Sequence, residues 1–419
     1  MSVPDGVIVK ILVINADCLN RNSSANLCHL AYIRGLVELG HQVVVLSADG
    51  KDYNVDACME LPECVENHTI YAVSLYEKLS LKKKRGKEQR EGDRDRKLVS
   101  VANVASDSPV TKIKKKILTL YGVHGIYSTF ERRAQKYRDE RDYNLIISVS
   151  TPAASHSTAE RLLKSGKIKT LRWLQIWEDP WYSDAYGLNR DKKIFEEEKR
   201  LLSAADKVCY VSPLTLLNQR KLYPESAEKM YWNPLPSYYD YDVKADEEEA
   251  VGRKTYGYFG DYMPEARDLR PFYEAALKTG ADVNLCGNPS DLFKETEHIR
   301  IYARMPLERL RPIEDRTHVL VFLCNLRGGQ IPGKIYQYSA TSKTILFILD
   351  GTEEEKKILA DYFGQFHRYV FCENTVEDIS RAIRDIEHGN LHGAINRPLD
   401  CFAPRKIAAD ILRGAEAKS

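Results

Sequence analysis

Short runs of apolar, β-branched residues alternate with helix-like apolar periods along the first half of the chain. Residues 7–15 (VIVKILVIN) form one such run and end in a polar loop at 16–24. A helical period of apolar residues follows over 27–37, and Gly40 precedes a second apolar run at 41–47. This strand–loop–helix–strand order predicts parallel strands joined by a right-handed crossover.

The same alternation continues through the first half of the chain. The elements that it predicts there are strand 143–150, helix 153–165, strand 171–177, helix 192–204, strand 207–211 and helix 214–222. Residues 234–254, rich in proline, tyrosine and acidic side chains, predict a linker. We therefore expect a doubly wound domain over residues 1–238.

A second series of strands and helices follows the linker. Its predicted elements are strand 254–259, helix 269–279, strands 282–286 and 319–323, a helix beginning at 334–340, strand 344–348, helix 376–388 and a last helix at 405–416. The fold class expected is α/β, with two tandem Rossmann-like doubly wound domains, the second over 253–400, and a tail helix within 401–419.

A highly basic segment, 78–116, interrupts the first series and has no apolar period, so we expect a mobile loop. From Lys78 to Arg141 there are 19 Lys and Arg against 8 Asp and Glu, a net charge of +11, which leaves −9 for the rest of a chain whose total is +2. The near-neutral total argues against a dedicated nucleic-acid-binding protein. The segregation predicts a surface that meets an anionic partner, although a solvated loop would have the same composition.

The composition is typical of a soluble globular protein: of 419 residues, 43% are apolar and 29% are charged. No run reaches the ~18–20 uncharged apolar residues that a membrane-spanning helix needs, and the first 15 residues lack the features of a signal peptide. Nine scattered cysteines, with no CxxC pair, indicate neither a disulfide framework nor a zinc site. We therefore expect a cytoplasmic protein.

The carboxyl ends of the predicted strands are where a ligand should bind. Doubly wound sheets bind ligands beyond these ends, and with two such domains the cleft between them is the expected site. In the second domain, Gly260 and Asp261 follow the first predicted strand, and Asn288 follows the second. These three residues are candidate ligand contacts.

The stretch NLRGGQIPGK (325–334) follows a later strand of the second domain. Gly328 and Gly329 would let backbone N–H groups approach a ligand closely, and a helix is expected to begin near Lys334. With Arg327 and Lys334 beside it, this arrangement favours an anionic diphosphate. A glycine-rich turn that merely joins a strand to a helix is the alternative interpretation.

Familiar phosphate and metal motifs are missing. The P-loop pattern GxxxxGK[ST] does not occur, and GxGxxG does not follow the first strand, which disfavours kinase-type chemistry and NAD binding. The DxD-like strings at 93–95 and 240–242 could hold a divalent cation, but both lie in charged loop or linker sequence. We expect no metal ion and no cofactor.

Five strings of the chain, in order, resemble the glycosyltransferases of the GT-B architecture, specifically the family 4-like retaining enzymes that use nucleotide-sugars. They are KILVIN…LAYIRGLVELGHQVVVLS, YNLIISVSTPAASHSTAERL, SAADKVCYVSPLTLLNQRKLYP, YGYFGD and IPGKIYQYSATSKTIL. The resemblance implies that the second domain binds the nucleotide-sugar, that the first binds the acceptor, and that the tail helix crosses back onto the first domain. It also implies metal-independent transfer.

Carried over by motif, the resemblance assigns the donor site. Gly260 would approach the diphosphate, the loop at 327–329 would enclose the nucleotide-sugar, and Lys334 could pair with a phosphate. The two glutamates of the family's E-x7-E motif fall on Gly329 and Gln337, so neither is present. Gln337 could still hydrogen-bond a ribose hydroxyl, whereas Gly329 has no side chain for the sugar.

In the first domain the candidate catalytic residues are Asp179 and His156. Asp179 follows Glu178 and a buried predicted strand, where its carboxylate could accept the proton of an acceptor hydroxyl. His156 stands near the start of a predicted helix. A helix cap or salt bridge is the alternative for Asp179, and core packing is the alternative for His156.

Three functions remain open at this point. The first is transfer of a sugar to a glycan or lipid-linked acceptor in surface polysaccharide synthesis, with residues 78–116 against an anionic membrane, such as the inner face of the plasma membrane. The second is a nucleotide-sugar 2-epimerase with the same fold. The third is a non-catalytic relative that binds a nucleotide or a partner, which the missing glutamates favour.

Overall fold

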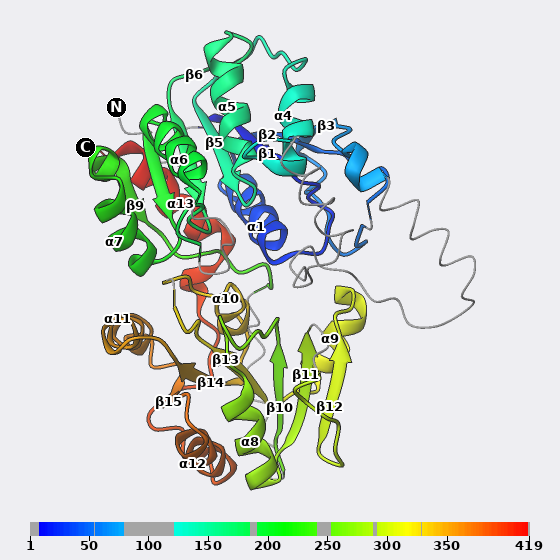
Figure 1. The fold of residues 1–419 in the computed structure, drawn as a ribbon, viewed down its shortest axis with the longest axis vertical. Coiled ribbons are helices and arrows are strands. Elements are labelled where there is room, and N and C mark those ends of the chain that lie inside the picture. Colours follow the sequence, from blue (N-terminus) through cyan, green and yellow to red (C-terminus); the bar gives the residue numbers. More distant parts are fainter. Residues whose placement is uncertain are drawn as a thin grey trace.

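A computed structural model describes residues 8–53, 55–78, 121–184, 191–240, 253–287, 291–327 and 329–417. They form two α/β domains, each built on a parallel sheet, which are stacked one above the other in Figure 1. The predicted fold class is confirmed. Most of the basic segment 78–116 lies outside the described residues.

The first domain contains a parallel sheet of seven strands. In spatial order the strands are β3 (Glu66–Ile70), β2 (Gln42–Ala48), β1 (Lys10–Asn15), β5 (Leu145–Ser150), β7 (Trp173–Trp177), β8 (Lys207–Tyr210) and β9 (Met230–Trp232). In β1, Ile11 lies opposite Val43 of β2 and Leu145 of β5. A separate pair of short strands, β4 (Asp142–Tyr143) and β6 (Lys169–Thr170), lies beside it.

Helices cover both faces of this sheet. Successive side chains of a strand point to opposite faces, and because the inner strands are mostly apolar, both faces present apolar side chains. Leu12 and Ile14 of β1 pack in a core with α4 (Ser128–Ala134), α5 (Ala154–Lys164) and α6 (Lys192–Ala204). Ile11 and Val13 point to the other face, which α1 (Ser24–Glu38) and α13 (Pro404–Glu416) cover. Helix α7 (Pro213–Leu222) and the 3-10 turns η1 (Gly125–Tyr127) and η2 (Pro224–Lys229) complete the described part of the domain.

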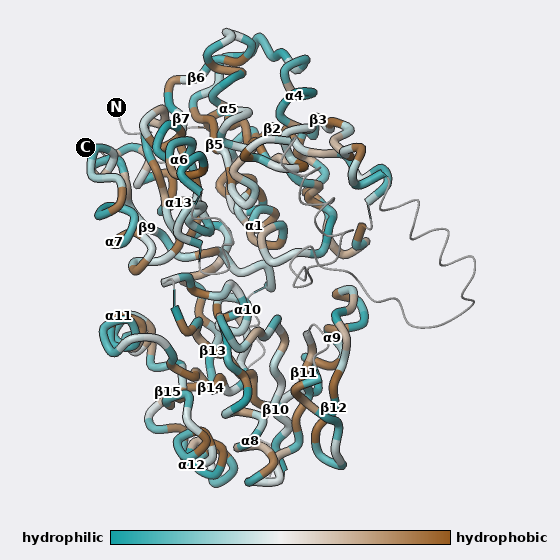
Figure 2. Tube along the Cα trace, in the orientation of Figure 1, coloured by the Kyte–Doolittle hydropathy of each residue, from teal (hydrophilic) through white to brown (hydrophobic). Residues whose placement is uncertain are grey.

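The second domain contains a six-stranded parallel sheet. In spatial order its strands are β12 (Ile299–Ala303), β11 (Asp282–Gly287), β10 (Thr255–Phe259), β13 (Val319–Leu323), β14 (Thr344–Leu349) and β15 (Val370–Glu373). One face packs on α8 (Arg270–Thr279) and α12 (Val376–Glu387). The other face packs on α9 (Leu307–Asp315), α10 (Lys334–Ser339) and α11 (Glu353–Gly364). Figure 2 shows hydrophilic and hydrophobic positions alternating along the outer helices α11 and α12.

One hydrophobic core continues from the first domain into the second. It joins residues of α1 and α13 to residues of α10 and α11, among them Ile33, Ile407, Ile335 and Phe363. Each of these side chains is fully buried, which contributes about 1.5–3 kcal/mol apiece to stability. The two domains therefore share apolar surface, as well as the polar contacts of the cleft described below.

The last helix crosses back onto the first domain, as predicted. It follows the 3-10 turn η3 (Asp400–Phe402) and packs against α1, where Gly35 leaves room for the backbone carbonyl of Pro404. Arg172 donates a hydrogen bond to the carbonyl of Ala415 at 2.5 Å, and Tyr231 donates one to the carbonyl of Ile411 at 3.1 Å. Among the described helices none is long and apolar enough to cross a bilayer.

Candidate functional site

Loops at the carboxyl ends of the strands meet between the two domains. Figure 1 shows β10, β11 and β12 pointing toward the first domain. The loop between β13 and α10 crosses to the end of β7, where Gln330 Nε2 lies 2.5 Å from Asp179 Oδ1 and 3.1 Å from Asp184 Oδ1. The ligand site was expected at the carboxyl ends of the strands, between the two domains. In the structure, the loops at these ends contact one another.

Asp179 lies at this contact, directly after β7. Its second oxygen, Oδ2, accepts a hydrogen bond from the Thr151 hydroxyl at 3.4 Å. The pKa of the Asp179 carboxyl is raised to about 7, chiefly by burial and also by the neighbouring carboxylates of Asp184 and Glu178, against the hydrogen bonds from Gln330 and Thr151. A carboxyl that titrates near neutral pH can both take up and release a proton, as acid–base chemistry requires.

Glu178 lies beneath the cleft in a buried ion pair that sequence reasoning missed. It is 7% exposed, and its Oε1 is 3.3 Å from Nε2 of His29 on α1. Burial raises the pKa of Glu178. Burial lowers the pKa of His29, but Glu178, the Ser150 carbonyl and Asp17 together outweigh burial and leave that pKa raised. No spacing in the sequence indicates that His29 of α1 and Glu178, directly after β7, lie together.

His156 lies in the core of the first domain. Its Nδ1 is 2.7 Å from the Ser148 hydroxyl, its ring packs 4.3 Å from that of Trp177, and its exposure is 0%. Burial holds its pKa well below the ordinary value, so the ring is neutral. In this arrangement a substrate cannot touch it, which favours core packing over the catalytic role expected from the sequence.

Gly260 and Asp261 form the donor-side loop after β10. The Gly260 N–H donates to the carbonyl of Cys286 at 2.9 Å, and Gly287 leaves space for the Gly260 carbonyl, which a β-carbon at 287 would strike. The Asp261 carboxylate lies 3.5 Å from Arg304. Asn288, which was expected to join them, lies outside the described residues.

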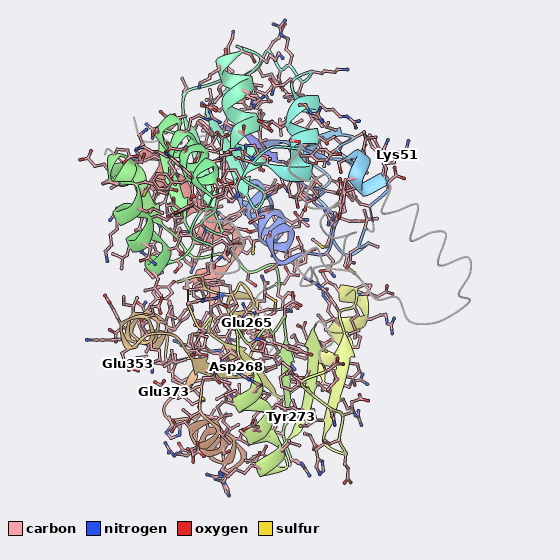
Figure 3. The ribbon with its side chains drawn as sticks, viewed as in Figure 1. Lys51, Glu265, Asp268, Tyr273, Glu353 and Glu373 are labelled. Carbon is pink, nitrogen blue, oxygen red and sulfur yellow. The ribbon has the colours of Figure 1, made fainter. Side chains whose placement is uncertain are left out.

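Arg267 is a donor-side cation that the sequence did not single out. Its guanidinium donates to Asn325 Oδ1 at 2.8 and 3.1 Å and to the Asp261 carbonyl at 3.1 Å. It lies on the loop that precedes α8, where Figure 3 labels Glu265 and Asp268. An isolated arginine in a polar loop has no distinctive spacing, and only the fold places it between the loops after β10 and β13.

The glycine-rich loop faces the first domain. Gly329 has φ +71°, and its carbonyl accepts hydrogen bonds from the hydroxyls of Ser212 at 2.5 Å and Thr215 at 3.3 Å. A β-carbon on Gly329 would lie 2.8 Å from that of Leu214. This glycine therefore serves a left-handed turn and a close interdomain approach. Arg327 is exposed, and Gly328 lies outside the described residues.

Lys334 is engaged with a carboxylate in this structure. Its Nζ lies 2.7 Å from Oε1 of Glu314 on α9 and 3.5 Å from the Tyr239 hydroxyl, which itself donates to Glu314. Its helix, α10, has only six residues, and Gly333 at its start faces Ser24 and Cys28 of α1. The helix start expected to receive a phosphate therefore packs on the first domain.

Gln337 holds the segment that joins the two domains. Its Oε1 accepts hydrogen bonds from the backbone N–H groups of Tyr238 at 2.5 Å and Tyr239 at 3.0 Å, and from the Ser237 hydroxyl at 3.3 Å. The side chain is buried, at 3% exposure. Its carbonyl oxygen thus binds protein groups where the resemblance implied a ribose hydroxyl.

No group of three or more His, Cys, Asp or Glu side chains that could hold a metal ion occurs within the described part of the chain. The DxD-like string at 93–95 lies outside that part, as do the last two residues of the string at 240–242. The metal-free expectation remains a prediction.

No protein-family model matches the chain, and no curated protein matches it. Solved structures do resemble it. The catalytic domain of starch synthase IV from Arabidopsis thaliana, bound to ADP and acarbose, matches with a TM-score of 0.63 and 10% identity, covering 98% of this chain and 99% of that one. A sucrose-phosphate synthase from Thermosynechococcus elongatus matches with a TM-score of 0.56 and 12% identity over 97% of this chain and 94% of that one.

A glycosyltransferase from Rickettsia africae matches with a TM-score of 0.51 and 13% identity, covering 98% of this chain and 100% of that one. At such identities the likeness concerns the arrangement of the chain in space. It extends over at least 97% of this chain in each case. The chain has the GT-B fold.

Proposed function

We propose that the chain is a nucleotide-sugar-dependent glycosyltransferase, with the donor bound by the second domain and the acceptor by the first. The observation that carries the proposal is the contact between Gln330 and Asp179. It brings the donor-side loop of one domain to a carboxyl of the other whose pKa is about 7. The GT-B fold supports the same assignment, although fold alone does not determine function.

The donor diphosphate would lie between the loops that follow β10 and β13. Gly260 follows β10 directly, and Arg267 supplies a guanidinium that suits phosphate oxygens. Lys334 can add a second cation once a phosphate competes with Glu314 for its ammonium group. Fixed cations stabilise the charge that develops on the leaving diphosphate.

Asp179 would act on the acceptor. The bond between the anomeric carbon and the diphosphate oxygen breaks, the acceptor oxygen bonds to that carbon, and the acceptor proton passes to the Asp179 carboxylate. The resemblance adds that configuration is retained and that no metal ion is needed. The acceptor class proposed is a glycan or a lipid-linked glycan of surface polysaccharide synthesis.

A basic and aromatic surface on the first domain supports a membrane-bound acceptor. The ring of Tyr71 lies 4.9 Å from the charge of Lys78, 5.1 Å from that of Arg133 and 5.8 Å from that of Lys51, which Figure 3 labels. Nearby in sequence, Leu75 is 74% exposed. We propose that this surface and the adjoining segment 78–116 contact anionic lipid, with the protein peripheral on the inner face of the plasma membrane.

A second candidate function is nucleotide or partner binding without catalysis. It is favoured by the engagement of Lys334 with Glu314 and of Gln337 with the linker, because these groups are then not free for a donor. A 2-epimerase would need acidic side chains around the donor sugar, and positions 329 and 337 supply none.

A ligand screen tests the proposal. Thermal unfolding is measured with ADP, UDP, GDP and TDP, since a ligand present at 100 times its Kd stabilises the native state by about 2.7 kcal/mol. If one of these nucleotides stabilises the protein, nucleotide-sugars with the same base are then assayed for transfer and hydrolysis. Turnover to free nucleoside diphosphate supports the transferase, interconversion of the sugar favours the epimerase, and binding without turnover favours the second candidate. A chain that binds no nucleotide contradicts the proposal.

A further inference from the structure

A single amide group bridges two carboxyl groups of the other domain. Gln330 Nε2 donates to Asp179 Oδ1 at 2.5 Å and to Asp184 Oδ1 at 3.1 Å. Gln330 is 7% exposed and belongs to the second domain, whereas both aspartates follow β7 of the first. An amide nitrogen has two N–H bonds, so this arrangement uses both of them.

The backbone of the same residue is tied to the donor-side cation. Asn325 Nδ2 donates to the Gln330 carbonyl at 3.2 Å, while Asn325 Oδ1 accepts from Arg267. Hydrogen bonds therefore run from Arg267 through Asn325 and Gln330 to Asp179. The position of the Gln330 side chain depends on the loop that would surround a diphosphate.

We propose that Gln330 is the positioning residue of Asp179: its amide, reaching across the cleft, orients the acceptor-side carboxylate, and Asp184 beside it sets how readily that carboxylate holds a proton. The role of Asp179 in catalysis rests on the proposed function. The effect of Gln330 on the Asp179 carboxyl rests on the contacts alone. The Gln330 amide reaches Asp179 only through the contact between the two domains, so the proton affinity of Asp179 is linked to that contact.

The charged and titratable groups around Asp179 come from three places. Glu178, directly after β7, precedes it and is paired with His29 of α1, and the same helix carries the buried thiol of Cys28. Asp184 comes from the loop after β7. The remaining contacts are neutral, from the Gln330 amide and the Thr151 hydroxyl. Asp184 is thus the carboxylate that shares a donor with Asp179, and Gln330 is that donor.

The test is the titration of the Asp179 carboxyl in the full-length, ligand-free protein. Aspartate carboxyl carbons are labelled with ¹³C, and the Asp179 signal is assigned by its loss in Asp179→Asn. In Gln330→Leu, which keeps the volume and removes both N–H donors, the pKa of Asp179 should rise because its ionised form loses a hydrogen bond. In Asp184→Asn the pKa should fall because a neighbouring negative charge is removed.

A rise in the Asp179 pKa in one variant and a fall in the other distinguish positioning from a general loosening of the structure. Loosening would expose Asp179 to water and lower its pKa toward that of an ordinary aspartate in both variants. Gln365→Leu, at an exposed glutamine directly after α11 that donates to the Tyr362 carbonyl, is the matched control and should leave the titration unchanged. Equal pKa values in Gln330→Leu and the unmodified protein would overturn the inference. Because the titration needs no substrate, this result is independent of whether any nucleotide-sugar is turned over.

Discussion

The hydroxyl of Ser212 donates a hydrogen bond to the carbonyl of Gly329 at 2.5 Å, and this bond joins the start of α7 in the first domain to the glycine-rich loop of the second. The bond depends on Gly329 itself, because φ there is +71° and Leu214 lies where a β-carbon would be. The loop is shaped to fit the other domain.

Gly329→Ala should therefore destabilise the protein. A left-handed backbone and a contact of 2.8 Å to the Leu214 β-carbon predict a loss of about 1–3 kcal/mol in the free energy of unfolding, measured by urea denaturation. Gly364→Ala is the control, since a β-carbon there meets nothing within 4 Å, and it should be neutral or stabilising. Equal stability of the two variants would contradict the proposed role of Gly329.

Lys334 and Glu314 should have opposite effects on donor binding. Lys334→Ala should weaken binding of the nucleoside diphosphate found in the ligand screen about tenfold, or ~1.4 kcal/mol. Glu314→Gln should strengthen it, because the ammonium group then lacks its carboxylate partner. Isothermal titration calorimetry measures both. Lys278→Ala, which removes an exposed lysine from the last turn of α8, should not change the Kd.

Asp179 should make stability depend on pH. Its pKa is about 7 in the folded protein and about 4 in an unfolded chain. Between these values the folded state holds more protons, so this carboxyl lowers the free energy of unfolding as the pH rises from ~4 to ~7. Relative to Asp179→Asn, the unmodified protein should therefore lose stability as the pH rises across this window. Above it, the curves of the free energy of unfolding against pH should run parallel for the two proteins. Urea denaturation at a series of pH values measures this, and parallel curves throughout would refute it.

The returning helix should contribute strongly to stability. Ile411 of α13 is 2% exposed within the core shared by both domains, so Ile411→Ala should cost about 2–5 kcal/mol. Ile395→Ala removes the same atoms from a side chain that is 53% exposed and should change the free energy of unfolding by less than ~0.5 kcal/mol. Chemical denaturation of the two variants distinguishes these outcomes.

Leu75 and Lys51 should matter for lipid binding. The double variant Leu75→Asp, Lys51→Glu should sediment less with vesicles of phosphatidylcholine and phosphatidylglycerol, because it loses an exposed apolar group and reverses a charge beside Tyr71. Leu277→Asp, at a leucine that is 48% exposed on α8, is the matched control. Undiminished sedimentation of the double variant would exclude this surface as the membrane contact.

Elements with strong apolar patterns could be predicted from the sequence, while polar elements could not. The expected helix at 192–204 is α6 with the same bounds. By contrast, β12 is a short edge strand, IRIYA, with only one neighbour, and helix α9 contains Pro312. Neither segment has a clear period of apolar residues in the sequence. Their formation depends on tertiary packing.

The candidate site was only partly predictable for a related reason. Asp179 could be placed because a strand end fixes its position in any doubly wound sheet. Its partner Gln330 lies about 150 residues further along the chain and in the other domain. His156 shows the converse difficulty, because a polar residue at the start of a helix has the same local sequence whether it faces a cleft or, as His156 does, the core.

The position of α13 has a consequence for biosynthesis. The residues of the first domain leave the ribosome before those of α13, which packs against α1 of that domain but is made after the whole second domain. Until then the apolar side chains that face Ile407 and Ile411 remain uncovered. We therefore expect the nascent first domain to remain incompletely packed, and to depend on chaperones, until α13 has been made, rather than to fold fully before the second domain is made.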